Sequence, residues 1–156
     1  MEERLVKVGI THGDINGIGY EVILKTLSDT RITELCTPVI YGSSKIAAYH
    51  RKALELPAVN LSIIAQAEDA GVNRVNIINC VDDETKVELC QSTTVAGEAA
   101  YLALEAAVTD LKRGAVDVLV TAPINKHNIQ NEQFHFPGHT EYLEQCFGGL
   151  GKNSLH

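Results

Sequence analysis

The sequence predicts an α/β fold in which helices cover the faces of a largely parallel sheet. Short strand-like runs alternate along the chain with segments of helical periodicity. The longest helical pattern is followed by a glycine and then by a run rich in β-branched residues, at 116–121. This order of helix, glycine and strand is typical of a βαβ unit, in which the two strands run parallel.

The predicted elements follow one another in a regular order. Five segments are predicted strands, at residues 5–11, 38–41, 61–65, 75–79 and 116–121. A helix is expected from Gly19 onward, and another over residues 45–54 with Ser44 as its N-cap. The longest helical pattern covers residues 94–113, and Gly114 is the expected stop, because glycine adopts the backbone conformation that ends many helices.

Charge and hydropathy narrow the classes of protein to which the chain can belong. The 20 acidic and 13 basic residues give a net charge of −7, which argues against a nucleic-acid-binding surface. A phosphorylated small molecule stays compatible, because a local pocket can be positive on an acidic protein. No apolar run approaches the roughly 20 residues that span a bilayer, and the acidic start is unlike a signal peptide. We therefore expect a cytoplasmic protein with no membrane or nucleic-acid partner.

None of the four cysteines lies in C-x-x-C spacing with another: they are Cys36, Cys80, Cys90 and Cys146. A zinc knuckle or a thioredoxin-type motif is therefore not expected. A metal or redox centre is one interpretation of these residues. Buried small hydrophobic side chains in a reducing compartment are the better one.

Three loops follow predicted strands or open predicted helices, where open α/β sheets gather their ligands. The first is THGDINGIGYE at residues 11–21, whose glycines allow backbone amides to approach a ligand closely. Its glycines match neither the Rossmann nor the P-loop spacing. A structural turn and a phosphate cradle are therefore equally good interpretations, and Asp14 is a possible cleft residue.

The second loop, residues 121–126, carries two further possible cleft residues, Asn125 and Lys126. A lysine at this place meets a phosphate or carboxylate, or it is an ordinary solvated side chain, and the spacing favours neither.

The third loop, FPGHTEY at residues 136–142, places His139 beside a predicted helix N-terminus. That position favours a neutral imidazole suited to hydrogen bonding with a substrate. Thr140 either caps the helix or donates to a phosphate. Taken alone, a single histidine is more often structural than catalytic.

Four motifs in one order carry more information than any of these loops alone. They lie at residues 12–21, 92–97, 121–126 and 136–141. Together they closely resemble the 4-hydroxythreonine-4-phosphate dehydrogenase family of pyridoxal phosphate biosynthesis, over nearly the whole chain.

The resemblance implies a fold of the isocitrate/isopropylmalate dehydrogenase type, with two α/β domains flanking a cleft. Residues 1–115 would form most of the first domain and residues 116–156 the start of the second. Family members are longer than this chain, so the expected fold is truncated here. The resemblance also implies a homodimer whose active site lies at the subunit interface.

The implied activity is the oxidation of 4-phosphooxy-L-threonine by NAD or NADP. The product, 2-amino-3-oxo-4-phosphooxybutanoate, loses CO2 to give 3-amino-2-oxopropyl phosphate. A divalent metal, zinc with magnesium or cobalt as alternatives, acts as Lewis acid, and its ligands are expected beyond residue 156. The Gly-His-Thr-Glu motif makes His139 and Thr140 the expected substrate-binding residues, and no catalytic residue is assigned.

Three alternatives stay open. One is a dehydrogenase of a phosphorylated threonate or erythronate, and another is a phosphate acyltransferase of related fold, against which the Gly-His-Thr-Glu motif argues. The third is an inactive fragment that retains affinity for phosphate. The chain by itself is predicted to be inactive and to associate, because metal ligands and covering elements are expected elsewhere.

Overall fold

The computed structural model describes residues 5–82 and 84–124 of the chain. These residues form a five-stranded sheet with the strand order β3-β4-β2-β1-β5, and every pairing in it is parallel. The strands are β1 Val6–Thr11, β2 Cys36–Gly42, β3 Leu61–Ile64, β4 Val75–Asn79 and β5 Val118–Thr121. The five predicted strands and the α/β fold class are confirmed.

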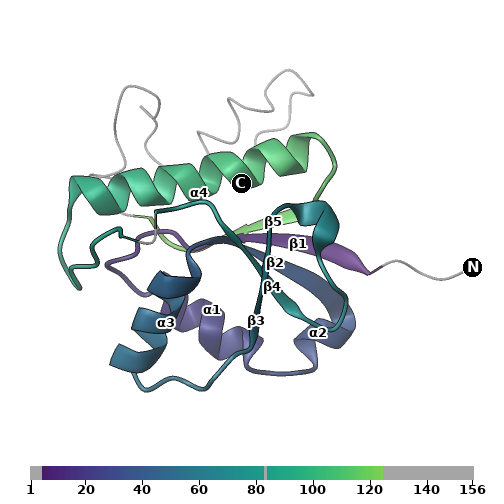
Figure 1. Ribbon diagram of the computed structural model, residues 1–156, viewed down its shortest axis with the longest axis horizontal. Helices are drawn as coiled ribbons and strands as arrows, with labels where there is room; N and C mark the ends of the chain where they lie inside the picture. The colour runs from purple at the N-terminus through teal and green to yellow at the C-terminus, as the bar shows by residue number, and fades with distance from the viewer. Residues whose placement is uncertain (1–4, 83, 125–156) are drawn as a thin grey trace, which may run out of the picture.

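Helices cover both faces of this sheet (Figure 1). They are α1 Gly19–Leu27, α2 Ile32–Leu35, α3 Ser44–Ala53 and α4 Thr94–Lys112, with a 3-10 turn η1 at Ala67–Asp69. The long helix α4 lies on one face, and α1 and α3 lie on the other. The parallel arrangement requires each strand to be reached by a crossover, and the helices supply most of these connections.

Two apolar clusters fill the space between the sheet and its helices. On the α1 and α3 side, strand residues such as Ile10 and Ile40 pack with Leu24 and Ile46 of the helices. On the α4 side, the buried helix residues include small alanines, such as Ala103 and Ala107, which pack with Val39, Tyr41 and Val116. Small side chains let α4 approach the sheet closely, so both faces of the central strands are buried.

The helix ends show how local sequence sets the boundaries. Ser43, rather than the expected Ser44, is the N-cap of α3: its backbone is extended and its hydroxyl accepts from the Ile46 amide at 3.3 Å. Ser44 is already helical, and its amide donates to Asn79 Oδ1 at 2.7 Å. Gly114 follows α4 with a φ of +80°, as expected for a residue that stops a helix.

Strand β5 belongs to the same sheet as the other four strands. Residues Val8–Thr11 of β1 pair in parallel with Val118–Thr121. The stretch assigned from the sequence to the start of a second domain thus begins within this sheet. The division into two domains stays a prediction.

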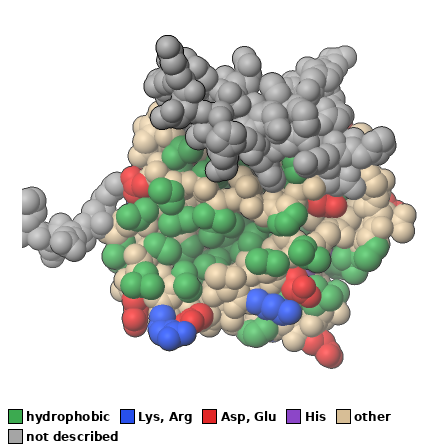
Figure 2. Space-filling model, turned by 180° about the vertical axis from the view of Figure 1, so that it is seen from behind, with side chains coloured by type: hydrophobic (Ala, Val, Ile, Leu, Met, Phe, Trp, Pro, Cys, Tyr) green, Lys and Arg blue, Asp and Glu red, His purple; other side chains and the backbone are tan. Residues whose placement is uncertain are grey.

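Among the described strands, β5 lies at one edge of the sheet. Val118 and Val120 of this strand are 44% and 52% exposed, and Val22 of α1 is also exposed. Figure 2 shows hydrophobic side chains gathered on the side of the molecule seen from behind. None of the described helices is long and apolar enough to cross a membrane.

Candidate functional site

The glycine-rich loop, defined as residues 12–18, leaves the carboxyl end of β1 and leads directly into α1. Gly13 has a φ of +67°, and a Cβ there would overlap the carbonyl group of Pro123. The next amide, of Asp14, donates to Pro123 O at 2.8 Å. This bond joins the motif at residues 12–21 to the motif at residues 121–126, because Pro123 follows β5.

The start of α1 is packed equally closely. A Cβ at Gly19 would overlap the carbonyl oxygen of His12, so only glycine allows the helix to begin against the end of β1. The contacts of Gly13 and Gly19 are with protein backbone. For these two glycines they support the structural-turn interpretation.

Asn16 links the glycine-rich loop to the segment that precedes α4. Its side chain is 2% exposed. Its amide nitrogen donates to Gln91 O at 3.0 Å and to Thr93 Oγ1 at 3.2 Å, and its amide oxygen accepts from the Glu88 backbone at 2.7 Å. Thr93 is the N-cap of α4, with Oγ1 accepting from Ala96 at 3.1 Å. Asn16 therefore ties the first motif to the one at the start of α4.

Three of the four motifs thus meet at the carboxyl end of β1. Open α/β sheets bind ligands at this edge. Asp14 lies there half-buried. Its Oδ1 accepts from the backbone amide of Asn16 at 3.0 Å, and this bond holds the carboxylate against the loop. The other predicted site residues, Asn125, Lys126, His139 and Thr140, lie outside the described residues.

Three aromatic rings form a stack, defined as His12 at the start of the loop, Tyr20 of α1 and His50 of α3. The ring centroids of His12 and Tyr20 are 5.4 Å apart, and those of Tyr20 and His50 are 5.5 Å apart. All three side chains are fully buried. Tyr20 Oη accepts from the Ser43 amide at 3.0 Å, which joins α1 to the cap of α3.

The stack also holds the loop backbone. His12 Nδ1 lies 2.7 Å from Gly13 O, and His50 Nε2 lies 2.6 Å from Ile15 O. Burial lowers the pKa of His12 to about 4, although the bond to Gly13 opposes the shift. Burial also lowers the pKa of His50 and raises that of Tyr20. Both imidazoles are therefore neutral near pH 7.

The described residues do not gather the donors that a metal site needs. They contain no group of three or more His, Cys, Asp or Glu side chains that would hold an ion. His12 and His50 are separated by the ring of Tyr20, and each uses one nitrogen on a backbone carbonyl. This part of the chain therefore does not fit a metal centre.

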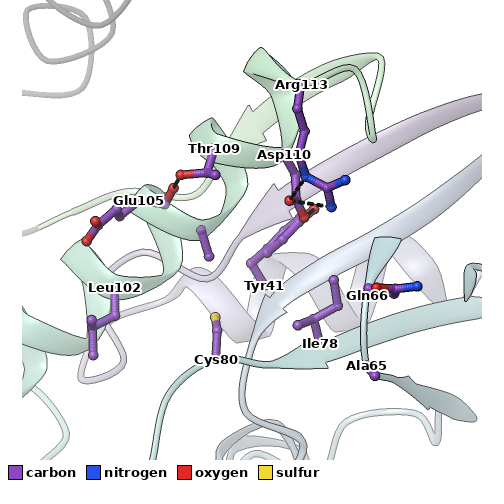
Figure 3. Close-up of a pocket in the computed structure, with 11 residues that line it drawn as sticks. Tyr41, Ala65, Gln66, Ile78, Cys80, Leu102, Glu105, Thr109, Asp110 and Arg113 are labelled. Atoms are coloured by element: carbon purple, nitrogen blue, oxygen red, sulfur yellow. Dashed lines mark hydrogen bonds and ion pairs between the residues drawn. The ribbon is translucent and has the colours of Figure 1, made fainter. Parts of the chain in front are cut away.

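Away from this edge, a hollow of about 440 Å³ lies between α4 and the sheet (Figure 3). Its cation is already neutralised: Arg113 pairs with Glu68 at 2.6 Å and with Asp110 at 2.9 Å. Asp110 also accepts from Tyr41 Oη at 2.6 Å. The hollow therefore offers no free cation to a phosphate, and we keep the edge at β1 as the candidate site.

The cysteines in the described part follow the sequence-based interpretation only in part. Cys36 and Cys80 are half-buried, and burial raises the pKa of the Cys80 thiol to about 12, so this thiol stays protonated. Cys90 is exposed in the loop before α4, where its backbone amide donates to Asn16 O at 2.9 Å, so the expectation of burial was wrong for this residue.

Comparison with known proteins decides the family. The family model described as pyridoxal phosphate biosynthetic protein PdxA matches residues 34–155. The chain belongs to this family. The resemblance seen in the sequence is therefore confirmed, and the PdxA match extends over most of the chain.

Individual relatives agree with the PdxA assignment. The chain is 58% identical to a 4-hydroxythreonine-4-phosphate dehydrogenase of Bacteroides thetaiotaomicron, over 99% of this chain and 42% of that protein. It is 32% identical to a putative D-threonate 4-phosphate dehydrogenase of Clostridium botulinum, over 87% of this chain and 41% of that protein. The chain thus spans less than half the length of these relatives.

A solved structure supports the fold of this PdxA family member. The 4-hydroxythreonine-4-phosphate dehydrogenase of Burkholderia phymatum superposes with a TM-score of 0.82 at 29% identity. The match covers 94% of this chain and 44% of that one.

The sequence alone did not indicate the residues that hold the glycine-rich loop at the carboxyl end of β1. Asn16 was read only as part of a turn, and His50 was not connected to the loop at all. For Asn16, the one local signal is an asparagine that lies between glycines. Nothing local indicates His50, because its partner is 35 positions away.

Proposed function

We propose that the chain forms part of an NAD(P)-dependent dehydrogenase that oxidises 4-phosphooxy-L-threonine in pyridoxal phosphate biosynthesis. The observation that carries the proposal is the 58% identity to a 4-hydroxythreonine-4-phosphate dehydrogenase over nearly the whole chain. The convergence of three motifs at the carboxyl edge of the sheet supports it. The product then loses CO2 to give 3-amino-2-oxopropyl phosphate.

Asp14 has the chemistry to meet the amino group of this substrate. A carboxylate repels a phosphate but attracts an ammonium group. Asp14 Oδ1 accepts from the backbone amide of Asn16, and the Asp14 side chain is half-buried rather than enclosed. We assign the phosphate and the remaining polar groups of the substrate to Asn125, Lys126, His139 and Thr140.

The nicotinamide ring accepts the hydride in this proposal, and a divalent metal, zinc before magnesium or cobalt, is the second cofactor. The described residues provide no donor set for the ion. We therefore place its ligands elsewhere in the protein. A two-domain subunit, a homodimer with the site at its interface, and a cytoplasmic location complete the proposal.

A second candidate is a D-threonate 4-phosphate dehydrogenase. It is favoured by the 32% identity to the Clostridium botulinum relative. The two substrates differ at carbon 2, where threonate carries a hydroxyl in place of the ammonium group. A negative side chain such as Asp14 favours the ammonium compound, so we rank this candidate second.

The test is a chimera that joins residues 1–156 to the part of the Bacteroides thetaiotaomicron relative that the chain does not match. NAD(P)H formation is followed with 4-phosphooxy-L-threonine and with D-threonate 4-phosphate, and the complete relative is the positive control. The proposal expects higher kcat/KM for the first substrate. A preference for the second supports the alternative, and a folded chimera active on neither refutes both.

His139→Ala in the same chimera tests the substrate-binding assignment. Loss of one substrate hydrogen bond in a closed site lowers kcat/KM by about tenfold or more. Unchanged kcat/KM would remove His139 from the site.

A further inference from the structure

We propose that His12 and His50 are positioning residues that act as a pair of neutral clamps on the glycine-rich loop and set the place of Asp14. The clamped carbonyls, of Gly13 and Ile15, belong to the residues on either side of Asp14. The importance of Asp14 rests on the proposed function, whereas the clamp itself does not.

The two bonds fix the tautomers of the rings. A backbone carbonyl only accepts, so the ring nitrogen that faces it carries the hydrogen. His12 is therefore protonated on Nδ1 and His50 on Nε2. Two histidines in one stack thus hold opposite tautomers, and each tautomer is set by a carbonyl of the same loop.

The free nitrogens explain why the clamp must be neutral. His12 Nε2 and His50 Nδ1 are buried and have no hydrogen-bond partner among the described residues. A second proton on either ring would create a buried donor without an acceptor, on a charged group. The stack is therefore built for the uncharged form of both rings.

The surroundings of the stack act in both directions. Tyr20 lies between the rings, and Tyr49 meets His50 edge-on at 5.7 Å between centroids. The carboxylates of Asp14 and Glu21 favour a charged His50. Burial outweighs them, so the pKa of His50 is lowered. His50 also disfavours a charge on His12, because it contributes to the lowered pKa of His12.

The clamp reaches the site through short covalent and hydrogen-bonded steps. Between the two clamped carbonyls, the Asp14 amide donates to Pro123 O at 2.8 Å, and the Asp14 carbonyl accepts from the Gly17 amide at 3.0 Å. Three backbone groups around one carboxylate are thus held by the stack or by the loop after β5. Loss of a clamp would release one of these backbone groups.

Matched variants separate the hydrogen bond from simple packing. A glutamine amide takes the place of Nε2 and an asparagine amide that of Nδ1, and neither titrates. His50→Gln and His12→Asn therefore keep a donor for the loop carbonyl, whereas His50→Leu fills the space without one. Amide hydrogen exchange of Asp14, Asn16 and Gly17 reports on the loop.

The first experiment is ¹⁵N NMR of the imidazoles in the purified chain, in solution or, for an associated chain, in the solid state. We expect opposite tautomers for His12 and His50, both neutral at pH 6. The same tautomer on both rings, or a charged ring at pH 6, would overturn the proposal. Both readings hold even if a variant fails to fold.

The second experiment compares exchange in the variants. His50→Leu should speed exchange of the three loop amides by about tenfold, as expected for one lost hydrogen bond, while His50→Gln stays close to the parent. Equal exchange in the two variants would overturn the clamp. Neither experiment involves substrate, so an inactive chimera would refute the proposed function and leave these results standing.

Discussion

Asn16 is the residue whose loss should be most costly at the candidate site. Replacement by alanine removes three side-chain hydrogen bonds, to Gln91, Thr93 and Glu88, from a position that is 2% exposed. At about 1 kcal/mol for each bond, the free energy of unfolding should fall by roughly 3 kcal/mol. The loss combines the three bonds with the cost of leaving their partners unsatisfied.

Urea unfolding of the purified chain, followed by circular dichroism, measures this loss. Asn60 is exposed, so Asn60→Ala is the matched control and should change stability by less than about 0.5 kcal/mol. Thr93→Ala removes one of the three partners and the cap of α4, so it should cost about 1 kcal/mol. If Asn16→Ala costs no more than Asn60→Ala, the link between the two motifs is not a stabilising one.

Four further predictions concern single residues. Gly13→Ala should destabilise the chain by more than 1 kcal/mol in urea unfolding, because its φ is positive and a Cβ overlaps backbone. Ser43→Ala should cost about 1 kcal/mol and Ser44→Ala much less, and equal losses would place the cap of α3 wrongly. Because the pKa of His12 is lowered from 6.5 to about 4, the unfolded chain binds the extra proton between these values. The free energy of unfolding should therefore drop by roughly 3 kcal/mol as the pH falls from 6.5 to 4, and His12→Asn should flatten that dependence. Lys126→Met in the chimera should lower activity more than thermal stability, and a loss of stability alone would make Lys126 structural.

The sheet was predictable because its signals are local. β4 was predicted at residues 75–79, the range that it has, and α4 was predicted to within one residue at its end. The predicted strands are short runs of apolar and β-branched residues, and such runs favour a strand whatever surrounds them. The four-residue helix α2 was not predicted, because one turn leaves too few residues for a periodic pattern.

The site was less predictable because its bonds are long-range. The motifs indicated the edge of the sheet, but the bond between Asp14 and Pro123 joins residues 109 positions apart. Likewise, β5 pairs with β1, and the paired residues Val8 and Val118 are 110 positions apart in the sequence. The choice between Ser43 and Ser44 as cap depended on which of two adjacent serines has an extended backbone. Only tertiary contacts decide such cases.

The open edge at β5 gives physical support to the prediction that the chain associates when alone. Val118 and Val120 are exposed on one face of β5, and the other pairing side of this strand, away from β1, has no partner among the described strands. Exposed apolar edge strands favour pairing with other chains. Analytical ultracentrifugation of the purified chain would detect this, and a concentration-independent monomer would contradict it.

We propose that these 156 residues supply one part of a dehydrogenase site and that catalysis needs a further part. The most direct measurement compares NAD(P)H formation from 4-phosphooxy-L-threonine by the purified chain and by the chimera, with and without added zinc. Mass spectrometry of the purified chain should be used to verify that it ends at His156 before the assay. We expect turnover by the chimera and none by the chain. Zinc-dependent turnover by the chain would show that a complete metal and substrate site lies within residues 1–156, and it would contradict the account.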